Sequence, residues 1–235
     1  MRCCFCQNYE ISRLGFGKEV SEERLEEIFF EQQARGASCL ELVTPGHYTD
    51  AIIGALSDAK KNGLRIPVVY NSNAYELPET LLRLRGLVDV FLPDLKYFDP
   101  ALAVRYSGVR DYFAYASEAI QTMYKMTGPF VMRDGIMIKG VIVRHLVLPG
   151  CSKDSIRVID WLCRTFKDNI YISVMNQYTP VYRAHEHPEI NRRLFTAEYL
   201  RVVRRCEELG LKNVYIQEGR TNLEKFIPVF NAAGV

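Results

Sequence analysis

The feature that most restricts the fold of this chain is a regular alternation of apolar runs with helical patterns. The apolar runs lie at 39–43, 66–70, 88–93, 140–148, 170–175 and 213–217. The helical patterns between and beside them lie at 20–35, 50–63, 77–86, 112–126, 155–166 and 196–210. Because the runs are apolar at consecutive positions, they predict parallel strands that are covered on both faces. We expect the strands from 39–43 to 170–175 to be parallel neighbours in chain order, in a doubly wound sheet or a barrel-like arrangement.

Local residues predict where several of these elements begin and turn. Ser21 and Thr196 are expected to cap the first and last helices, and Pro78 suits the first turn of a short helix. Asp134 and Gly135 stand between two apolar arms, which predicts a β-hairpin over 130–138 with a two-residue turn. We expect this hairpin to lie outside the parallel sheet.

Length and composition exclude several classes of protein. The 235 residues suit one large domain, and we expect a single domain over 1–235. The net charge is only +2, and no run of Lys and Arg is present, so we expect no nucleic-acid partner. No apolar stretch reaches 18 residues, so we expect no membrane association. Four of the seven cysteines are scattered singly, which indicates free thiols and a cytoplasmic location.

Three cysteines crowd the first six residues, at Cys3, Cys4 and Cys6. The spacing of Cys3 and Cys6 is that of thiolates which bind zinc or iron from one tight loop. A zinc site needs a second pair or histidines, and His185 and His187 lie far away in the sequence. A thioredoxin-like motif needs a preceding strand, which is absent here. The remaining alternative is an irregular terminus with incidental cysteines.

Polar residues follow most of the predicted strands, at the edge where ligands bind in both candidate arrangements. The candidate ligand-binding residues at these strand ends are Thr44, Asn71, Asp94, Lys96, His145 and Asn176, with His47, Arg144 and Gln177 beside them. Other interpretations stay open. Asp94 and Lys96 can be a solvated strand end, His145 a satisfied core histidine, and His47 part of a turn.

The opening stretch RCCFCQNYEIS resembles the cluster loop of radical S-adenosylmethionine enzymes, in the branch related to pyruvate formate-lyase activating enzymes. In that superfamily a C-x3-C-x2-C loop holds three irons of a [4Fe-4S] cluster, and the fourth iron binds S-adenosylmethionine. The resemblance implies that Cys3 and Cys6 are the second and third ligands and that Cys4 is a spacer. It places the first ligand upstream of Met1. We therefore expect a truncated chain that is inactive as given.

The resemblance extends over nearly the whole chain. LPDLKYFDP resembles the strand end where activating enzymes carry Asp-x-Lys, which implies that Asp94 holds the ribose hydroxyls and Lys96 the methionine carboxylate. VTPGH at 43–47 departs from the Gly-Gly-Glu-Pro stretch that receives the substrate's amino group. VRHLVLPG and MNQYTPVYRAHEHPEINR also resemble this branch, so His145, Asn176 and Gln177 are expected to face the cavity.

The fold implied by the resemblance is an α/β fold, a partial (β/α) barrel of the radical SAM type that lacks its first strand. The implied activity is reductive cleavage of S-adenosylmethionine to a 5′-deoxyadenosyl radical, which abstracts a hydrogen atom. The branch suggests a glycyl-radical enzyme as partner, with an external one-electron reductant. Two alternatives stay open: a radical SAM enzyme that modifies a peptide or small molecule, and a non-catalytic fragment with an incomplete metal site.

Overall fold

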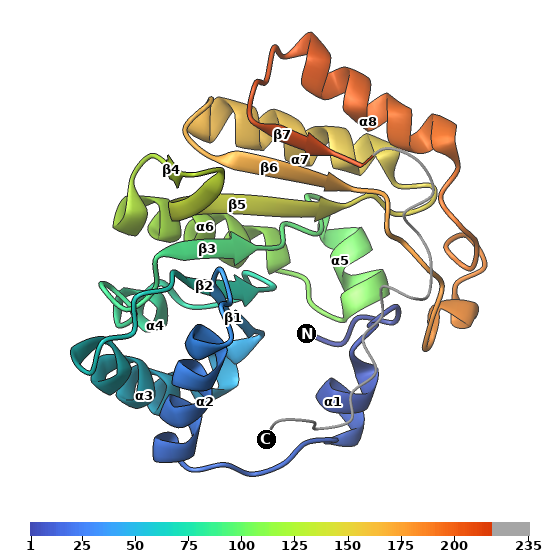
Figure 1. Cartoon of the computed structure of the whole chain (residues 1–235). Coiled ribbons are helices and arrows are strands. Elements are labelled where there is room, and N and C mark those ends of the chain that lie inside the picture. Colours follow the sequence, from blue (N-terminus) through green and yellow to red (C-terminus); the bar gives the residue numbers. More distant parts are fainter. Residues whose placement is uncertain (218–235) are drawn as a thin grey trace. The chain divides into compact units, whose positions relative to one another are not determined.

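A computed structural model describes residues 1–217 of the chain (Figure 1). The chain divides into two compact units. Among the described residues, the first unit contains 1–16, 94–114 and the residues from Val143 onward, and the second contains 17–93 and 115–142. The candidate residues are thereby divided between the units: Cys3, Cys6, Asp94, Lys96, His145 and Asn176 belong to the first, and Thr44 and Asn71 to the second.

The described residues contain strands and helices in the predicted alternation (Figure 1). The strands are β1 (Leu40–Val43), β2 (Val68–Ser72), β3 (Val90–Pro93), β4 (Val131–Arg133), β5 (Ile136–Leu146), β6 (Tyr171–Met175) and β7 (Val214–Ile216). The α-helices are α1 (Tyr9–Leu14), α2 (Glu22–Ala34), α3 (Thr49–Lys61), α4 (Pro78–Leu82), α5 (Pro100–Ser107), α6 (Tyr112–Thr127), α7 (Ser152–Phe166) and α8 (Thr196–Glu208). Two short 3-10 helices are η1 (Pro45–Tyr48) and η2 (Ala184–Glu186). No helix among residues 1–217 is long and apolar enough to cross a membrane.

The strands follow one another across the sheet in the order β1-β2-β3-β5-β6-β7, and β4 pairs with β5 off this path. The pairs β1–β2, β2–β3, β3–β5 and β6–β7 are parallel. The register sets Val43 beside Asn71, and Asn71 beside Leu92. The predicted α/β class and the predicted order of neighbours are thus confirmed. In such a sheet the residues after β1, β2 and β3 emerge at one edge.

The predicted hairpin is present, but the expectation that it lies outside the sheet is wrong. β4 pairs antiparallel with β5, and the turn residues Asp134 and Gly135 have φ values of 50° and 79°, the left-handed pair that a type I′ turn requires. β5 then continues without a break to Leu146 and pairs with β3 from Gly140. The second arm of the hairpin is therefore the beginning of a sheet strand.

Helix ends follow the predicted caps in one case and depart from them in another. The Ser21 hydroxyl accepts a hydrogen bond from the Arg24 N–H at the start of α2, as expected for an N-cap. Thr196 is not a cap, because it is already the first residue of α8. Phe195 occupies the cap position, and the Glu198 carboxylate accepts its N–H at 3.0 Å. The short helices α1 and α5 were not predicted from the sequence.

Candidate functional site

The cysteine loop of the first unit is a tight turn attached to the end of α5. Within the turn, the Cys6 N–H donates to the Cys3 carbonyl at 3.3 Å. The Arg2 and Cys4 N–H groups donate to the Ser107 and Tyr106 carbonyls at 2.9 and 2.8 Å. These bonds satisfy carbonyls that the end of a helix leaves without partners. The loop is thus fixed against the polypeptide rather than extended into solvent.

The three thiols of the loop have different surroundings. Cys3 and Cys6 are half-buried, and the Ser107 hydroxyl donates to Cys3 Sγ at 3.1 Å. Cys4 is only 7% exposed, and burial, with a contribution from Cys3, raises the pKa of its thiol to about 11. Cys4 therefore stays a protonated apolar residue, which supports its expected role as a spacer. All seven cysteines are free, and the described residues hold no group of three or more His, Cys, Asp or Glu side chains able to bind a metal ion.

A compact charge cluster follows β3 in the same unit. Lys96 Nζ donates to Asp94 Oδ2 at 2.6 Å, and Arg144 Nε donates to Asp94 Oδ1 at 2.8 Å. The side chains of Asp94 and Lys96 are 15% and 18% exposed. Asp94 and Lys96 are two positions apart and thus project from the same side of an extended chain. Asp94 also bridges Arg144 in parallel register, which brings the third charge to this side.

Charge outweighs burial in this cluster. Burial alone would raise the pKa of Asp94, but the positive charges of Lys96 and Arg144 hold it below its usual value. Burial alone would lower the pKa of Lys96, but Asp94 and then Cys3 hold it above its usual value. The cluster is therefore ionised at neutral pH and carries one net positive charge. Tyr97 follows Lys96, and its hydroxyl lies 2.9 Å from the Ser107 hydroxyl that donates to Cys3 Sγ. The cysteine loop and the charge cluster are therefore neighbours within one unit.

His145 has a different environment from its neighbour Arg144. Its ring is 1% exposed, and Nδ1 lies 2.7 Å from the Leu95 carbonyl. Burial lowers the pKa of His145 to about 4, so the ring is neutral and Nδ1–H donates to that carbonyl. Adjacent residues of a strand point to opposite faces, so His145 is expected on the face away from the Arg144 side chain. This arrangement favours support of the Leu95 backbone over contact with a ligand.

Thr44 and Asn71 lie together in the second unit, at the carboxyl ends of β1 and β2. The Thr44 N–H donates to the Asn71 carbonyl at 2.7 Å. The Asn71 amide is buried and donates to Glu41 Oε1 at 2.6 Å. That Thr44 and Asn71 share one cavity with Asp94 and Lys96 stays a prediction.

The residues after β6 provide less evidence for a ligand-binding role. The Asn176 N–H donates to Gln217 Oε1 at 2.7 Å, so this backbone position links the ends of β6 and β7. His185 is exposed, and its Nδ1 is 3.0 Å from the Tyr182 carbonyl, as suits a surface turn. Arg144 and Ser107 belong to the site although the sequence did not assign them a role. The strand-end rule could have found Arg144, whereas nothing in the sequence indicates that Ser107 meets Cys3.

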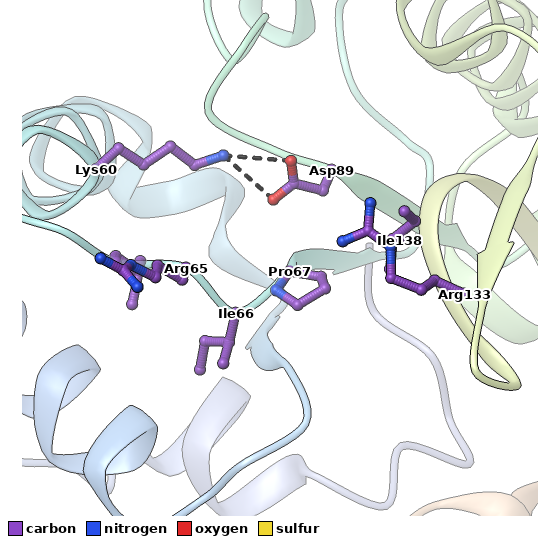
Figure 2. A pocket seen from close by; sticks show the side chains of 8 residues that line it. Lys60, Arg65, Ile66, Pro67, Asp89, Arg133 and Ile138 are labelled. Carbon is purple, nitrogen blue, oxygen red and sulfur yellow. Dashed lines mark hydrogen bonds and ion pairs between the residues drawn. The ribbon is translucent and has the colours of Figure 1, made fainter.

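A separate cavity of about 270 Å³ lies in the second unit (Figure 2). Its lining residues come mainly from just before β2 and β3 and from the β4–β5 hairpin: Lys60, Leu64, Arg65, Ile66, Pro67, Asp89, Arg133 and Ile138. Lys60 Nζ donates to both carboxylate oxygens of Asp89 at 3.3 and 3.2 Å, and Figure 2 shows this pair at one side of the cavity. Asp89 also accepts the Val68 N–H at 2.8 Å. This cavity lies at the amino ends of β2 and β3, the opposite end from Thr44 and Asn71, so it is not part of the candidate site.

Comparison of sequences gives a relative of unknown activity. No protein-family model matches the chain. The chain is 31% identical over 224 residues to the uncharacterized protein MJ0674 of Methanocaldococcus jannaschii, an alignment that covers 91% of this chain and 61% of that protein. The chain therefore spans about three fifths of the length of this relative.

Comparison of structures identifies the fold. SuiB of Streptococcus suis bound to the precursor peptide SuiA matches with a TM-score of 0.63 and 13% identity, over 94% of this chain and 46% of SuiB. SuiB bound to S-adenosylmethionine matches with a TM-score of 0.60 and 16% identity, over 93% and 47%. Coproporphyrinogen III oxidase HemN of Escherichia coli, a radical SAM enzyme, matches with a TM-score of 0.56 and 10% identity, over 89% and 50%. The chain thus has the α/β fold of these proteins, with the partial barrel arrangement of a radical SAM enzyme.

Proposed function

We propose that this chain is the catalytic region of a radical SAM enzyme. The observation that carries the proposal is the pairing of Asp94, Lys96 and Arg144 next to a loop with two half-buried cysteines, within one unit. Similarity to HemN and to SuiB with bound S-adenosylmethionine supports it at the level of the fold. We treat both units as parts of one domain over 1–235, in a protein of the cytoplasm.

The residues of the loop fit a metal–sulfur group in their donor chemistry. Cys3 and Cys6 are soft thiolate ligands on one turn, half-buried, with a hydroxyl donor on Cys3. They would hold part of a [4Fe-4S] cluster. When bound, that cluster supplies the electron for reductive cleavage of S-adenosylmethionine to a 5′-deoxyadenosyl radical, with an external one-electron reductant as the source.

The charge cluster would bind and orient S-adenosylmethionine. An ionised Asp94 accepts hydrogen bonds from the two ribose hydroxyls, and each of its oxygens keeps a lone pair beyond its bond to a cation. Lys96 and Arg144 present the net positive charge that a methionine carboxylate requires. Because the cluster is largely buried, these bonds form in a region from which most water is excluded. Thr44, Asn71 and Asn176 remain proposed contributors to cofactor binding, whereas His145, predicted to face the cavity, is proposed to support the Leu95 backbone instead.

We propose a polypeptide as the substrate. SuiB has been seen with its precursor peptide, and the resemblance to activating enzymes points to a glycine of a glycyl-radical enzyme. Both candidates are polypeptides. An assay for 5′-deoxyadenosine separates them from a small-molecule substrate, because product that requires an added polypeptide favours the peptide class.

Titration calorimetry under anaerobic conditions tests the proposed function. A chain that also carries the expected upstream cysteine, reconstituted with iron and sulfide, should bind S-adenosylmethionine saturably and should not bind ATP, an anionic control that shares the adenosine group. Absence of any S-adenosylmethionine binding, or equal binding of ATP, would contradict the proposal.

A further inference from the structure

The backbone between Asp94 and Lys96 is held by one side chain from outside the sheet. On one side of this segment, the Leu95 N–H donates to the Arg144 carbonyl at 2.9 Å. The Asp94 carbonyl and the Lys96 N–H both bond to the hydroxyl of Tyr112. The hydroxyl donates to the Asp94 carbonyl at 2.6 Å and accepts the Lys96 N–H at 2.9 Å. A single oxygen atom therefore joins the backbone groups of both functional residues.

The surroundings of Tyr112 make this bridge rigid. Tyr112 is the first residue of α6, its side chain is 0% exposed, and its ring packs edge-on against Tyr97 at 5.6 Å. Burial raises the pKa of the Tyr112 hydroxyl well above its usual value, so it keeps the proton it donates. Water cannot easily replace the Tyr112 hydroxyl at such a buried position. Rotation of the Asp94 carbonyl or the Lys96 N–H away from that hydroxyl would therefore leave a buried polar group without a hydrogen bond.

We propose that Tyr112 is a positioning residue for cofactor binding, which fixes the relative orientation of the Asp94 carboxylate and the Lys96 ammonium. The inference rests on the proposed function, because it assumes that these two groups hold S-adenosylmethionine. Two groups that bind opposite ends of one ligand must keep their spacing, and small displacements reduce affinity. The Tyr112 bridge sets that spacing from behind the site without contacting the ligand.

Tyr199 provides a matched control for a purely structural role. Its hydroxyl also joins two backbone groups, donating to the Val174 carbonyl at 2.9 Å and accepting the Gln217 N–H at 2.8 Å. Tyr199 is 3% exposed and belongs to the same unit, but its bonds lie at β6 and β7 rather than at Asp94 and Lys96. Loss of either hydroxyl removes the same kind of buried bridge, which consists of two hydrogen bonds to the backbone.

The test compares Tyr112→Phe and Tyr199→Phe by thermal unfolding and by calorimetric titration with S-adenosylmethionine, in a reconstituted chain that also carries the expected upstream cysteine. Both variants should lower the melting temperature by similar amounts. Only Tyr112→Phe should raise the Kd, by tenfold or more. A Kd for Tyr112→Phe within twofold of the wild type, or an equal increase for Tyr199→Phe, would overturn the inference.

A second readout needs no ligand and separates this inference from the proposed function. In ¹⁵N NMR the Lys96 ammonium should give a slowly exchanging signal in the wild type and in Tyr199→Phe, because its ion pair is held in place. The signal should be lost in Tyr112→Phe. A wild-type chain without that signal would refute the positioning role. If the signal behaves as expected but no variant binds S-adenosylmethionine, the proposed function fails while the effect of Tyr112 on Lys96 stands.

Discussion

Lys96 illustrates how a single residue can be recognised as functional from the forces that act on it. Its ammonium group is largely buried, which disfavours the charged form, yet the neighbouring Asp94 carboxylate keeps it protonated. A lysine that only decorates a strand end would be solvated and would need no such compensation. The buried charge of Lys96 supports the proposal that this position binds an anionic group.

Substitution of Lys96 should weaken cofactor binding with little effect on folding. Asp94 keeps its bond to Arg144 in Lys96→Ala, so no unpaired carboxylate is left buried. We expect S-adenosylmethionine binding to weaken by about 1.5–3 kcal/mol, the contribution of a charge-assisted hydrogen bond, as measured by calorimetry. Lys60→Ala is the control, because Lys60 pairs with Asp89 in a comparable partly buried ion pair, away from the carboxyl ends of the strands. Unchanged affinity in Lys96→Ala, or equal loss in Lys60→Ala, would argue against the assignment of Lys96.

The three cysteines of the loop should differ in their contribution to metal binding. Cys3 and Cys6 are half-buried, whereas Cys4 is buried and protonated. In a chain that also carries the expected upstream cysteine, we expect Cys3→Ala and Cys6→Ala to abolish the iron content after anaerobic reconstitution, and Cys4→Val to leave it nearly unchanged. Iron and sulfide analysis measures the outcome. Loss of iron in Cys4→Val with retention in Cys3→Ala would show that the ligands have been assigned in the wrong register.

The sequence indicated candidate residues that can be found from their position along one strand, and the roles of these residues stay predictions. Asp94 and Lys96 follow an apolar run, and that pattern is visible without a structure. Tyr112 and Ser107 could not be predicted, because their roles depend on contacts with residues that are distant in the sequence. Arg144 is intermediate: its strand end was noted, but only the pairing of Asp94 with Arg144 shows that it completes the charge cluster.

At the scale of elements, β5 shows where local signals mislead. The Asp134-Gly135 turn was recognised correctly, but a hairpin arm and a sheet strand that follow each other without a turn are indistinguishable as apolar runs. Gly140, with a φ of 139°, lies where β5 begins to pair with β3. A Cβ atom there would lie 2.7 Å from the Cβ of Phe130, so the close approach requires glycine. The short helix α5 was missed because eight residues carry too little periodicity to be recognised.

The hydrogen bond between His145 on β5 and the Leu95 carbonyl after β3 predicts a dependence of stability on pH. His145 is neutral in the folded chain, with a pKa of about 4 compared with 6.5 when unfolded. Below pH 6.5 the unfolded chain therefore binds a proton that the folded chain does not. The free energy of unfolding should fall by about 3 kcal/mol from this group as the pH decreases from 6.5 to 4.

His145→Asn isolates that contribution, because the Asn amide can still donate to the Leu95 carbonyl but does not titrate. Urea unfolding at pH 7 and pH 4 should show a smaller loss of stability in the variant than in the wild type. Equal losses in the two proteins would mean that His145 is not held neutral by burial.

At the scale of the whole molecule, the alternation of apolar runs and helical patterns was sufficient to predict the α/β class and the order of the strands. The hydrophobic pattern of the sequence could not distinguish a doubly wound sheet from a barrel-like arrangement, since both bury their strands on two faces. Similarity to SuiB and HemN resolves this choice, although 10–16% identity carries the fold and not the substrate. The proposed function therefore depends on the chemistry of the first unit.

The most direct test of this account is the crystal structure of the chain grown anaerobically with S-adenosylmethionine. We predict electron density for the ribose at the Asp94 carboxylate and for the methionine carboxylate at Lys96, with the sulfonium end toward Cys3 and Cys6. Density for the ligand away from Asp94 and Lys96, for example at the Lys60–Asp89 cavity, would contradict the central claim that the charge cluster after β3 is a cofactor site.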